Sequence, residues 1–167
     1  MARFSQFVFT LLSLSIQTVF GCPSGWLSHN DKCYFLSSFK ASWPAAESYC
    51  RTFQSYCRTF HAKLAEPMDR SSINFLSGEV KGSPPLTGTD YFLGGGDLFV
   101  EGEWIWMSTQ ALISATNWAP GEPNDGGHHE DCLVIYPSAG LWNDATCSDQ
   151  KGFICEMEAE MAGSLIG

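Results

Sequence analysis

Seven oxygen-bearing side chains crowd one stretch of the chain. They lie among glycine, proline and histidine residues typical of a loop, and they are Glu122, Asn124, Asp125, Glu130, Asp131, Asn143 and Asp144. Carboxylates this close in sequence repel one another unless a cation lies between them. Calcium binds about six to eight oxygen ligands in irregular geometry, so this composition predicts a calcium site. A solvated acidic loop without a cation is the alternative.

Two cysteines flank the second half of this stretch. A disulfide between Cys132 and Cys147 would close a loop of about fifteen residues, which the chain-entropy model values at roughly 3 kcal/mol. It would also hold Glu130 at a fixed separation from Asn143 and Asp144. A fixed separation is what a metal site with ligands from distant segments needs.

Catalytic chemistry has little support in the sequence. His128 and His129 precede Glu130, which could suggest a zinc hydrolase, but the sequence lacks the HExxH pattern of such enzymes. It also lacks a recognisable set of nucleophile, base and orienting residue. We therefore expect a binding protein and not an enzyme.

The N-terminus has the features of a secretory signal peptide. Residues 1–21 combine an early positive charge at Arg3, a mostly apolar stretch and the small residue Gly21 at the expected cleavage site. A membrane anchor is the alternative, but the stretch is short, interrupted by polar residues and followed by no basic cluster. We expect a secreted protein without membrane insertion, with one domain over residues 22–158 and a frayed tail over 159–167.

Charge narrows the class of partner. The formal net charge is −9, and removal of Arg3 with the signal peptide would make it −10. Nucleic acid is not an expected partner, because its phosphates need a basic surface. A surplus of carboxylates in a secreted protein either favours solubility or binds hard cations such as calcium.

The cysteine count is odd, and a short repeat contributes to it. All seven cysteines lie after residue 21, so an oxidising compartment allows at most three disulfides and leaves one thiol over. The segment SYCRTF at residues 48–53 recurs at 55–60, which provides both Cys50 and Cys57. Either Cys50 or Cys57 could form a disulfide with another cysteine of the same chain. The other is a buried free thiol or joins two chains through an intermolecular disulfide.

Hydrophobic periodicity predicts two helices after an N-terminal hairpin. Two short aromatic segments surround the turn signal SHNDK, which favours a hairpin closed by Cys22 and Cys33. Apolar residues recur at helical spacing over residues 43–64, and a seven-residue insertion keeps the same helix face toward the core. A second helix fits residues 70–80, where Gly78 favours an early end.

The second half of the chain is rich in strand signals. Segments at 91–95, 102–107, 132–136 and 152–157 are apolar and bounded by turn residues. Trp104 and Trp106 alternate around Ile105, which is typical of a core strand and not of an exposed platform for a sugar ring. Helices followed by strands with long loops favour an α+β fold.

The chain resembles a long-form C-type lectin-like domain from Cys22 to Cys155. The resemblance rests on short motifs in the family order: Cys22 with Cys33, SWPAAESYC, WIWM, EPN at 122–124, EDC at 130–132, WND at 142–144 and GFICE. Each motif alone is weak evidence, but the complete series is specific. The implied fold has two helices packed on small antiparallel sheets, with long calcium-binding loops and disulfide cross-links.

The resemblance also implies which residues bind calcium. A principal calcium ion would be bound by Glu122, Asn124, Glu130, Asn143 and Asp144. Pro123 would be cis, which is rare enough to be a deliberate feature. An auxiliary calcium ion would be bound by Asp97, Glu101, Asp125, Glu130 and Asp131.

The same resemblance implies a disulfide between the first helix and Cys155. Cys50 has the family spacing when residues are counted forward from Trp43, and Cys57 has it when they are counted back from Leu64. The sequence does not choose between them. A disulfide-linked homodimer through whichever cysteine is left over would raise avidity.

The implied ligands are glycans of the mannose type. In such lectins two neighbouring hydroxyls of the sugar complete the calcium shell, and each hydroxyl also donates to a carboxylate and accepts from an amide. EPN implies equatorial 3- and 4-hydroxyls, as in mannose, N-acetylglucosamine, glucose and fucose; relatives that bind galactose usually carry QPD. The implied role is innate-immune glycan recognition or agglutination. The alternative is a matrix or interaction protein on the same fold that binds no sugar.

Overall fold

The computed structural model describes residues 20–52, 62–82 and 84–161. Helices and strands both occur there, which confirms the α+β class. In chain order the elements are β1 (Phe20–Gly21), β2 (Leu27–His29), β3 (Lys32–Leu36), α1 (Trp43–Thr52), β4 (Lys63–Leu64), α2 (Arg70–Gly82), β5 (Tyr91–Gly96), β6 (Ile105–Trp106), β7 (Cys132–Ile135), β8 (Trp142–Ala145), β9 (Gly152–Glu158) and β10 (Glu160–Met161).

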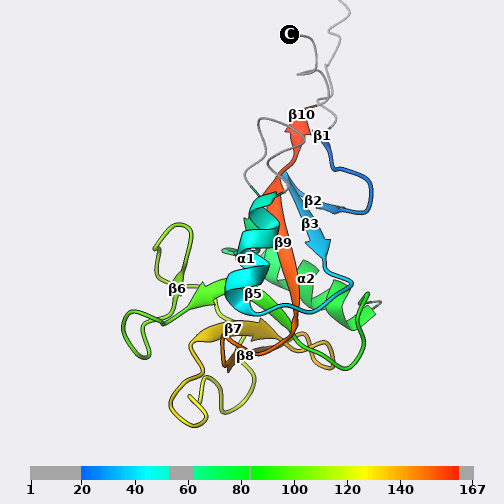
Figure 1. The fold of residues 1–167 in the computed structure, drawn as a ribbon. Coiled ribbons are helices and arrows are strands. Elements are labelled where there is room, and N and C mark those ends of the chain that lie inside the picture. The colour runs from blue at the N-terminus through cyan, green and yellow to red at the C-terminus, as the bar shows by residue number, and fades with distance from the viewer. Residues whose placement is uncertain (1–19, 53–61, 83, 162–167) are drawn as a thin grey trace, which may run out of the picture.

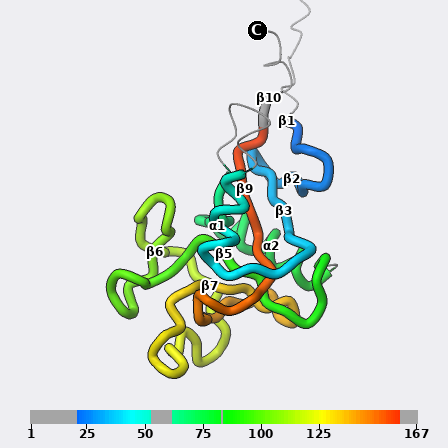
Figure 2. The backbone as a smooth tube through the Cα atoms, in the orientation of Figure 1, coloured from blue at the N-terminus to red at the C-terminus, as the bar shows by residue number. Residues whose placement is uncertain are grey.

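Strand β9 organises the sheet. The strand order is β2-β3-β9-β5-β7-β8, with β4 paired to β9 and β6 paired to β5. All of these pairs are antiparallel except β5 with β9, which run parallel. In Figure 1, β9 runs along the molecule beside α1, and the yellow loop that precedes β7 lies at the opposite end from β1 and β10. The tube in Figure 2 shows β1 and β10 side by side at that far end.

The two helices cover opposite faces of strands β5 and β7. Ile73 of α2 belongs to a core cluster with Tyr91 and Leu133, whereas Cys50 of α1 belongs to a second cluster with Phe92 and Val134. Successive strand residues therefore alternate between the two clusters. Burial of both faces explains why these strands are apolar without a polar alternation.

Helix α1 is shorter than its apolar pattern indicates. The helical spacing extends to Leu64, but the described helix is Trp43–Thr52 and Leu64 lies in strand β4. Leu64 pairs with Cys155 of β9, so its backbone completes the sheet. The expectation of one helix face over 43–64 is wrong at this end, because a buried apolar residue at the right spacing also fits a strand.

Helix α2 is confirmed and longer than expected. Asp69 caps its N-terminus: the backbone N–H of Ser72 donates to Asp69 Oδ1 at 2.9 Å and the Ser72 hydroxyl donates to Oδ2 at 2.9 Å. Gly78 does not end the helix, which continues to Gly82. An interior glycine costs about 1 kcal/mol relative to alanine but does not break a helix whose apolar face is buried.

Three disulfides cross-link the described chain. They join Cys22 to Cys33, Cys50 to Cys155 and Cys132 to Cys147. The predicted disulfides of the N-terminal hairpin and of the segment beside WND are therefore confirmed. Between the two copies of the repeat, the structure selects Cys50 as the partner of Cys155. Cys57 lies outside the described residues.

The strand expectations are confirmed with two differences. Of the segment 102–107, only Ile105–Trp106 forms a strand; Trp104 and Trp106 are both buried, as expected for core residues. Strand β8 was not expected, and it carries the WND motif.

At the chain ends, Phe20–Gly21 pairs with Glu160–Met161, in segments expected to be a signal peptide and a frayed tail. In the part of the chain that the structure describes, neither helix has the length and apolar character needed to cross a membrane.

Candidate functional site

The candidate site is built on the β7–β8 ladder. Asp144 pairs with Leu133 and Asn143 pairs with Val134, so both residues stand on a strand within the sheet. The Cys132–Cys147 disulfide ties the two strands together at the end of the ladder. Glu130 comes two residues before β7. The bridge that the sequence predicted is present, and it ties the segment that carries Glu130 to the segment that follows WND.

Asp144 anchors the EPN loop to strand β8. Its Oδ2 atom accepts hydrogen bonds from the backbone N–H groups of Asn124, at 2.9 Å, and Asp125, at 2.6 Å. The residue is only 1% exposed. A buried carboxylate that accepts two N–H groups fixes a loop that has little secondary structure of its own.

The EPN residues form a donor and acceptor pair. The Asn124 side-chain amide donates to Glu122 Oε2, and the Glu122–Pro123 peptide bond is cis, as the resemblance implies. Partial burial raises the pKa of Glu122, and repulsion from Asp144 and Glu130 raises it further.

Glu130 closes the loop on the other side. Its Oε2 atom accepts a hydrogen bond from the backbone N–H of Gly126 at 2.7 Å. A Cβ atom at position 126 would lie 2.5 Å from that same oxygen, so a larger residue here would displace the Glu130 carboxylate. The sequence interpretation did not single out Gly126, although the NDGG turn signal marks it.

Four further acids, together with Glu130, were expected at an auxiliary site. Asp97 is 4% exposed; its Oδ2 accepts from the Gly102 N–H at 2.9 Å, and its own N–H donates to the Asp131 carbonyl at 3.2 Å. Burial raises the pKa of Asp97, and repulsion from Asp131 and Asp144 adds to this. The pKa of Glu101 is raised as well, first by loss of solvent and then by repulsion from the acids at 97, 125, 131 and 144.

Asp125 connects the two groups of acids. Its Oδ1 accepts from the Glu130 N–H at 3.2 Å, and its Oδ2 lies 3.0 Å from His128 Nδ1. These interactions lower the pKa of Asp125, chiefly through the backbone hydrogen bond. His128 thus contacts a carboxylate. The described residues contain no group of three or more His, Cys, Asp and Glu side chains that could hold a metal ion by themselves.

A hard cation fits the oxygens that the structure leaves over. Asn143 Oδ1, Asp144 Oδ1 and Asp97 Oδ1 are buried and accept no hydrogen bond from the described residues. Buried oxygens normally have a partner, and calcium is the partner that carboxylate and carboxamide oxygens favour. The acids alone do not converge on one point. Two of the five principal ligands are asparagines, and Glu122 and Glu130 hydrogen-bond to neighbouring groups.

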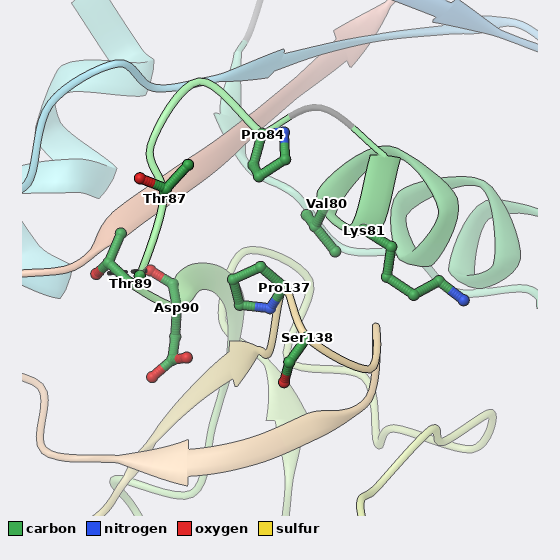
Figure 3. Close-up of a pocket in the computed structure, with 9 residues that line it drawn as sticks. Val80, Lys81, Pro84, Thr87, Thr89, Asp90, Pro137 and Ser138 are labelled. Carbon is green, nitrogen blue, oxygen red and sulfur yellow. Dashed lines mark hydrogen bonds between the residues drawn. The ribbon is translucent and has the colours of Figure 1, made fainter.

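A pocket elsewhere contains none of the predicted site residues. It has a volume of about 460 Å³ and lies where α2 ends, between Val80, Pro84, Thr89, Asp90 and Pro137 (Figure 3). Asp90 is ion-paired with Lys151 at 3.2 Å, which neutralises the carboxylate that lines this pocket. We therefore assign the candidate function to the acidic loops and not to this pocket.

Comparison with known proteins identifies the domain type. Residues 39–157 match the family model described as lectin C-type domain. The chain is 35% identical over 142 residues to perlucin from Haliotis laevigata, which covers 83% of this chain and 84% of that protein. Members of this family are generally binding proteins without enzymatic activity, and such domains generally bind calcium and carbohydrate.

Solved structures agree with this fold. The cow C-type carbohydrate-recognition domain of CD23, solved in the presence of a GlcNAc2Man3 oligosaccharide, matches with a TM-score of 0.71 and 29% identity over 85% of this chain and 99% of that one. A calcium-independent type II antifreeze protein matches with a TM-score of 0.68 and 21% identity over 85% of this chain and 98% of that one, a likeness of fold alone. The fold therefore serves more than one function.

Proposed function

Since the chain belongs to the C-type lectin domain family, we propose that it is a secreted, calcium-dependent lectin for mannose, N-acetylglucosamine or fucose-type glycans. The observation that carries this proposal is the position of the Glu122 and Asn124 pair. The Asp144 carboxylate fixes the backbone of Asn124, whose side-chain amide donates to Glu122, and Asp144 Oδ1 is a buried oxygen that accepts no hydrogen bond from the described residues.

The calcium ligands in this proposal are Glu122, Asn124, Glu130, Asn143 and Asp144. Calcium, when bound, supplies a Lewis acid that two vicinal hydroxyls of a sugar can coordinate. Glu122 would accept a hydrogen bond from one hydroxyl, and the Asn124 amide would donate to the other. This order of acceptor and donor supports equatorial 3- and 4-hydroxyls. The cow CD23 domain solved with a mannose-containing oligosaccharide is consistent with that ligand class.

We also propose an auxiliary calcium site at Asp97, Glu101, Asp125, Glu130 and Asp131. Asp97 supports it best, because its Oδ1 is buried and accepts no hydrogen bond from the described residues. Calorimetric titration should give two calcium ions per chain, and Asp97→Asn should reduce this to one. A stoichiometry of one in the unmodified protein would contradict the auxiliary site and leave the principal site standing.

Secretion and a role in glycan recognition complete the proposal. Residues 1–21 have the pattern of a signal peptide, and three disulfides suit an oxidising compartment. An innate-immune or agglutinating role is inferred from the glycan class alone. Secretion is tested by N-terminal sequencing of the protein from culture medium, which should begin at Cys22.

Affinity chromatography tests the sugar and the metal together. The protein should bind mannose-agarose in calcium and elute with a chelator or free mannose, but not with free galactose. The double substitution Glu122→Gln with Asn124→Asp reverses the order of donor and acceptor, so it should shift elution toward galactose. Asp149→Asn, on an exposed side chain outside the site, is the control.

The alternative is an interaction protein that binds no sugar. The structural likeness to an antifreeze protein shows that this fold is not restricted to lectins. Failure to bind mannose-agarose, N-acetylglucosamine and fucose, in a protein that still binds calcium, would favour that alternative.

A further inference from the structure

A groove of about 550 Å³ lies beside the EPN loop. Its lining is mostly apolar and comes from one stretch of the chain, residues 102–123: Trp104, Leu112, Ile113, Trp118 and Pro123. Glu103 is the charged residue among those that line it. None of the proposed calcium ligands lines this groove.

We propose that the groove binds a neutral apolar substituent on the glycan held by Glu122 and Asn124. The ligand class is then an amphipathic glycoside, with an alkyl or aryl group attached to the sugar, and not a free sugar alone. This inference rests on the proposed function and adds a second contact surface to it.

The groove adjoins the proposed sugar site through Pro123. This proline lines the groove, and its neighbours in the chain are the two residues proposed to select the sugar. Pro123 and Asn124 are both exposed. A group attached to a sugar at Glu122 and Asn124 would therefore extend over Pro123 toward the groove.

The walls of the groove suit an alkyl group better than a second sugar. Leu112 is 69% exposed and so offers open apolar surface, whereas Trp104 is only 8% exposed and offers little open ring face. Sugar rings stack on open aromatic faces, but alkyl groups gain from any apolar surface that they remove from water. Leu112 and Ile113 supply that surface.

The groove is held rigidly. The Ile113 N–H donates to the Trp104 carbonyl at 2.9 Å, and Leu112 forms a bridge with Ile105 of β6. The rings of Trp104 and Trp118 pack edge to face with centroids 4.8 Å apart. A preformed wall loses little conformational entropy when a ligand binds.

Charge excludes an anionic substituent. Glu103 lines the groove and the whole chain has a net charge of −9, so a sulfate, phosphate or carboxylate there would be repelled. An apolar substituent without charge avoids this repulsion.

The test compares methyl α-mannoside with hexyl α-mannoside, used below its micelle concentration, on the full protein in calcium. Binding is followed by NMR of the Leu112 and Ile113 methyl groups. We expect the hexyl glycoside to bind at least about tenfold more tightly, since each buried methylene strengthens binding by several-fold. We also expect only the hexyl glycoside to shift these methyl signals.

Two variants of matched exposure locate the effect. Leu112→Ser should remove most of the advantage of the hexyl glycoside and leave binding of methyl α-mannoside unchanged. Phe99→Ser is the control, because Phe99 is 70% exposed and does not line the groove. It should keep the full advantage.

The outcomes separate this inference from the proposed function. Equal affinity for both glycosides, with unmoved methyl signals, overturns the groove and leaves the sugar site standing. A different result overturns the link to Glu122 and Asn124: hexyl mannoside still shifts the Leu112 methyl signals in chelator, and methyl mannoside does not bind. Failure of both mannosides to bind in calcium, together with failure of N-acetylglucosamine and fucose to bind, overturns both proposals.

Discussion

Asp144 Oδ2 lies 2.9 Å from the backbone nitrogen of Asn124, so a strand residue holds the loop residue proposed to select the sugar. The Asp125 nitrogen lies 2.6 Å from the same oxygen. One buried carboxylate therefore determines where two successive loop residues lie. The relationship links the sheet, which the sequence specifies through its apolar strands, to a loop with no strand or helix of its own.

Removal of this carboxylate should destabilise the protein even without calcium. Asp144→Ala leaves the Asn124 and Asp125 N–H groups without their acceptor, and we expect a loss of about 2 kcal/mol in the free energy of unfolding. Urea unfolding in chelator measures this loss apart from any metal effect. Asp149→Ala, with a side chain 51% exposed, is the control and should change the free energy by less than about 0.5 kcal/mol. Equal stability of both variants would contradict the anchoring role of Asp144.

A second network of buried carboxylates is centred on Lys63. Lys63 Nζ lies 2.6 Å from Glu66 Oε2 and 3.6 Å from Glu156 Oε1, and the two carboxylates are 1% and 2% exposed. Glu66 also accepts hydrogen bonds from the N–H and hydroxyl of Ser108, at 2.8 Å each. This lysine thus connects β4, β9 and the loop after β6.

Lys63→Met should be strongly destabilising. It removes a cation from two buried carboxylates, and breaking a buried pair in this way costs about 3 kcal/mol. Burial already raises the pKa of Glu156, while Lys32 and Lys63 oppose the rise, so the variant should raise that pKa further. Arg51→Met is the matched control, because Arg51 is 64% exposed and its pair with Glu47 is worth at most about 1 kcal/mol. Chemical unfolding at neutral pH compares the two variants; a loss for Lys63→Met no larger than that for Arg51→Met would contradict this role.

The sequence was sufficient for the elements that carry their own pattern. Helix α2 could be expected because Ile73, Leu76 and Val80 repeat at helical spacing, and all three are fully buried. Strands β7 and β9 could be expected because their apolar runs are bounded by turns. The cation site that the cluster of acids predicts stays a prediction.

Features that depend on distant contacts could not be read from local patterns. Leu64 continues a helical spacing but pairs with Cys155, which is remote in sequence. WND is polar enough to suggest a loop, yet the ladder with β7 makes Asn143 and Asp144 part of a strand. The close approach of Glu130 to the Gly126 backbone arises only when the loop folds back on itself. The choice of Cys50 over Cys57 likewise depends on where α1 lies against β9.

The cap of α2 makes part of the stability depend on pH. Hydrogen bonds from Ser72 lower the pKa of Asp69 below its ordinary value of 3.8. A lowered pKa in the folded state stabilises the protein above the ordinary pKa, and this contribution is lost as the pH falls through the folded-state pKa. Asp69→Asn keeps a capping side chain that does not ionise. Between pH 5 and 2, the free energy of unfolding of this variant should therefore fall less than that of the unmodified protein.

Unfolding followed by circular dichroism at a series of pH values tests this contribution. Asp69→Ala should lose about 1 kcal/mol at pH 7, since alanine cannot cap the helix. Glu79→Gln, in the same helix but away from the cap, is the control and should follow the unmodified protein across the pH range. Parallel pH profiles for the unmodified protein and Asp69→Asn would show that the cap does not titrate in the expected way.

The duplicated segment gives a prediction about two cysteines of identical local sequence. Cys50 is paired with Cys155 across 105 residues of chain, and loss of a crosslink of that length costs about 4 to 5 kcal/mol in the chain-entropy model. Cys50→Ser should therefore unfold at a much lower denaturant concentration. Cys57→Ser should leave the free energy of unfolding unchanged, because every other cysteine is already paired.

Thiol titration and non-reducing electrophoresis then decide what Cys57 does. One titratable thiol per chain in a monomer would make Cys57 a free thiol and contradict the disulfide-linked homodimer. A protein that is a dimer and becomes monomeric in Cys57→Ser would support that homodimer. The monomeric variant should lose retention on mannose-agarose at low ligand density, where two sites per particle matter most. Cys50 is not a candidate for a bond between chains, because it is paired with Cys155. If Cys57→Ser destabilised the protein as much as Cys50→Ser does, the pairing itself would be wrong.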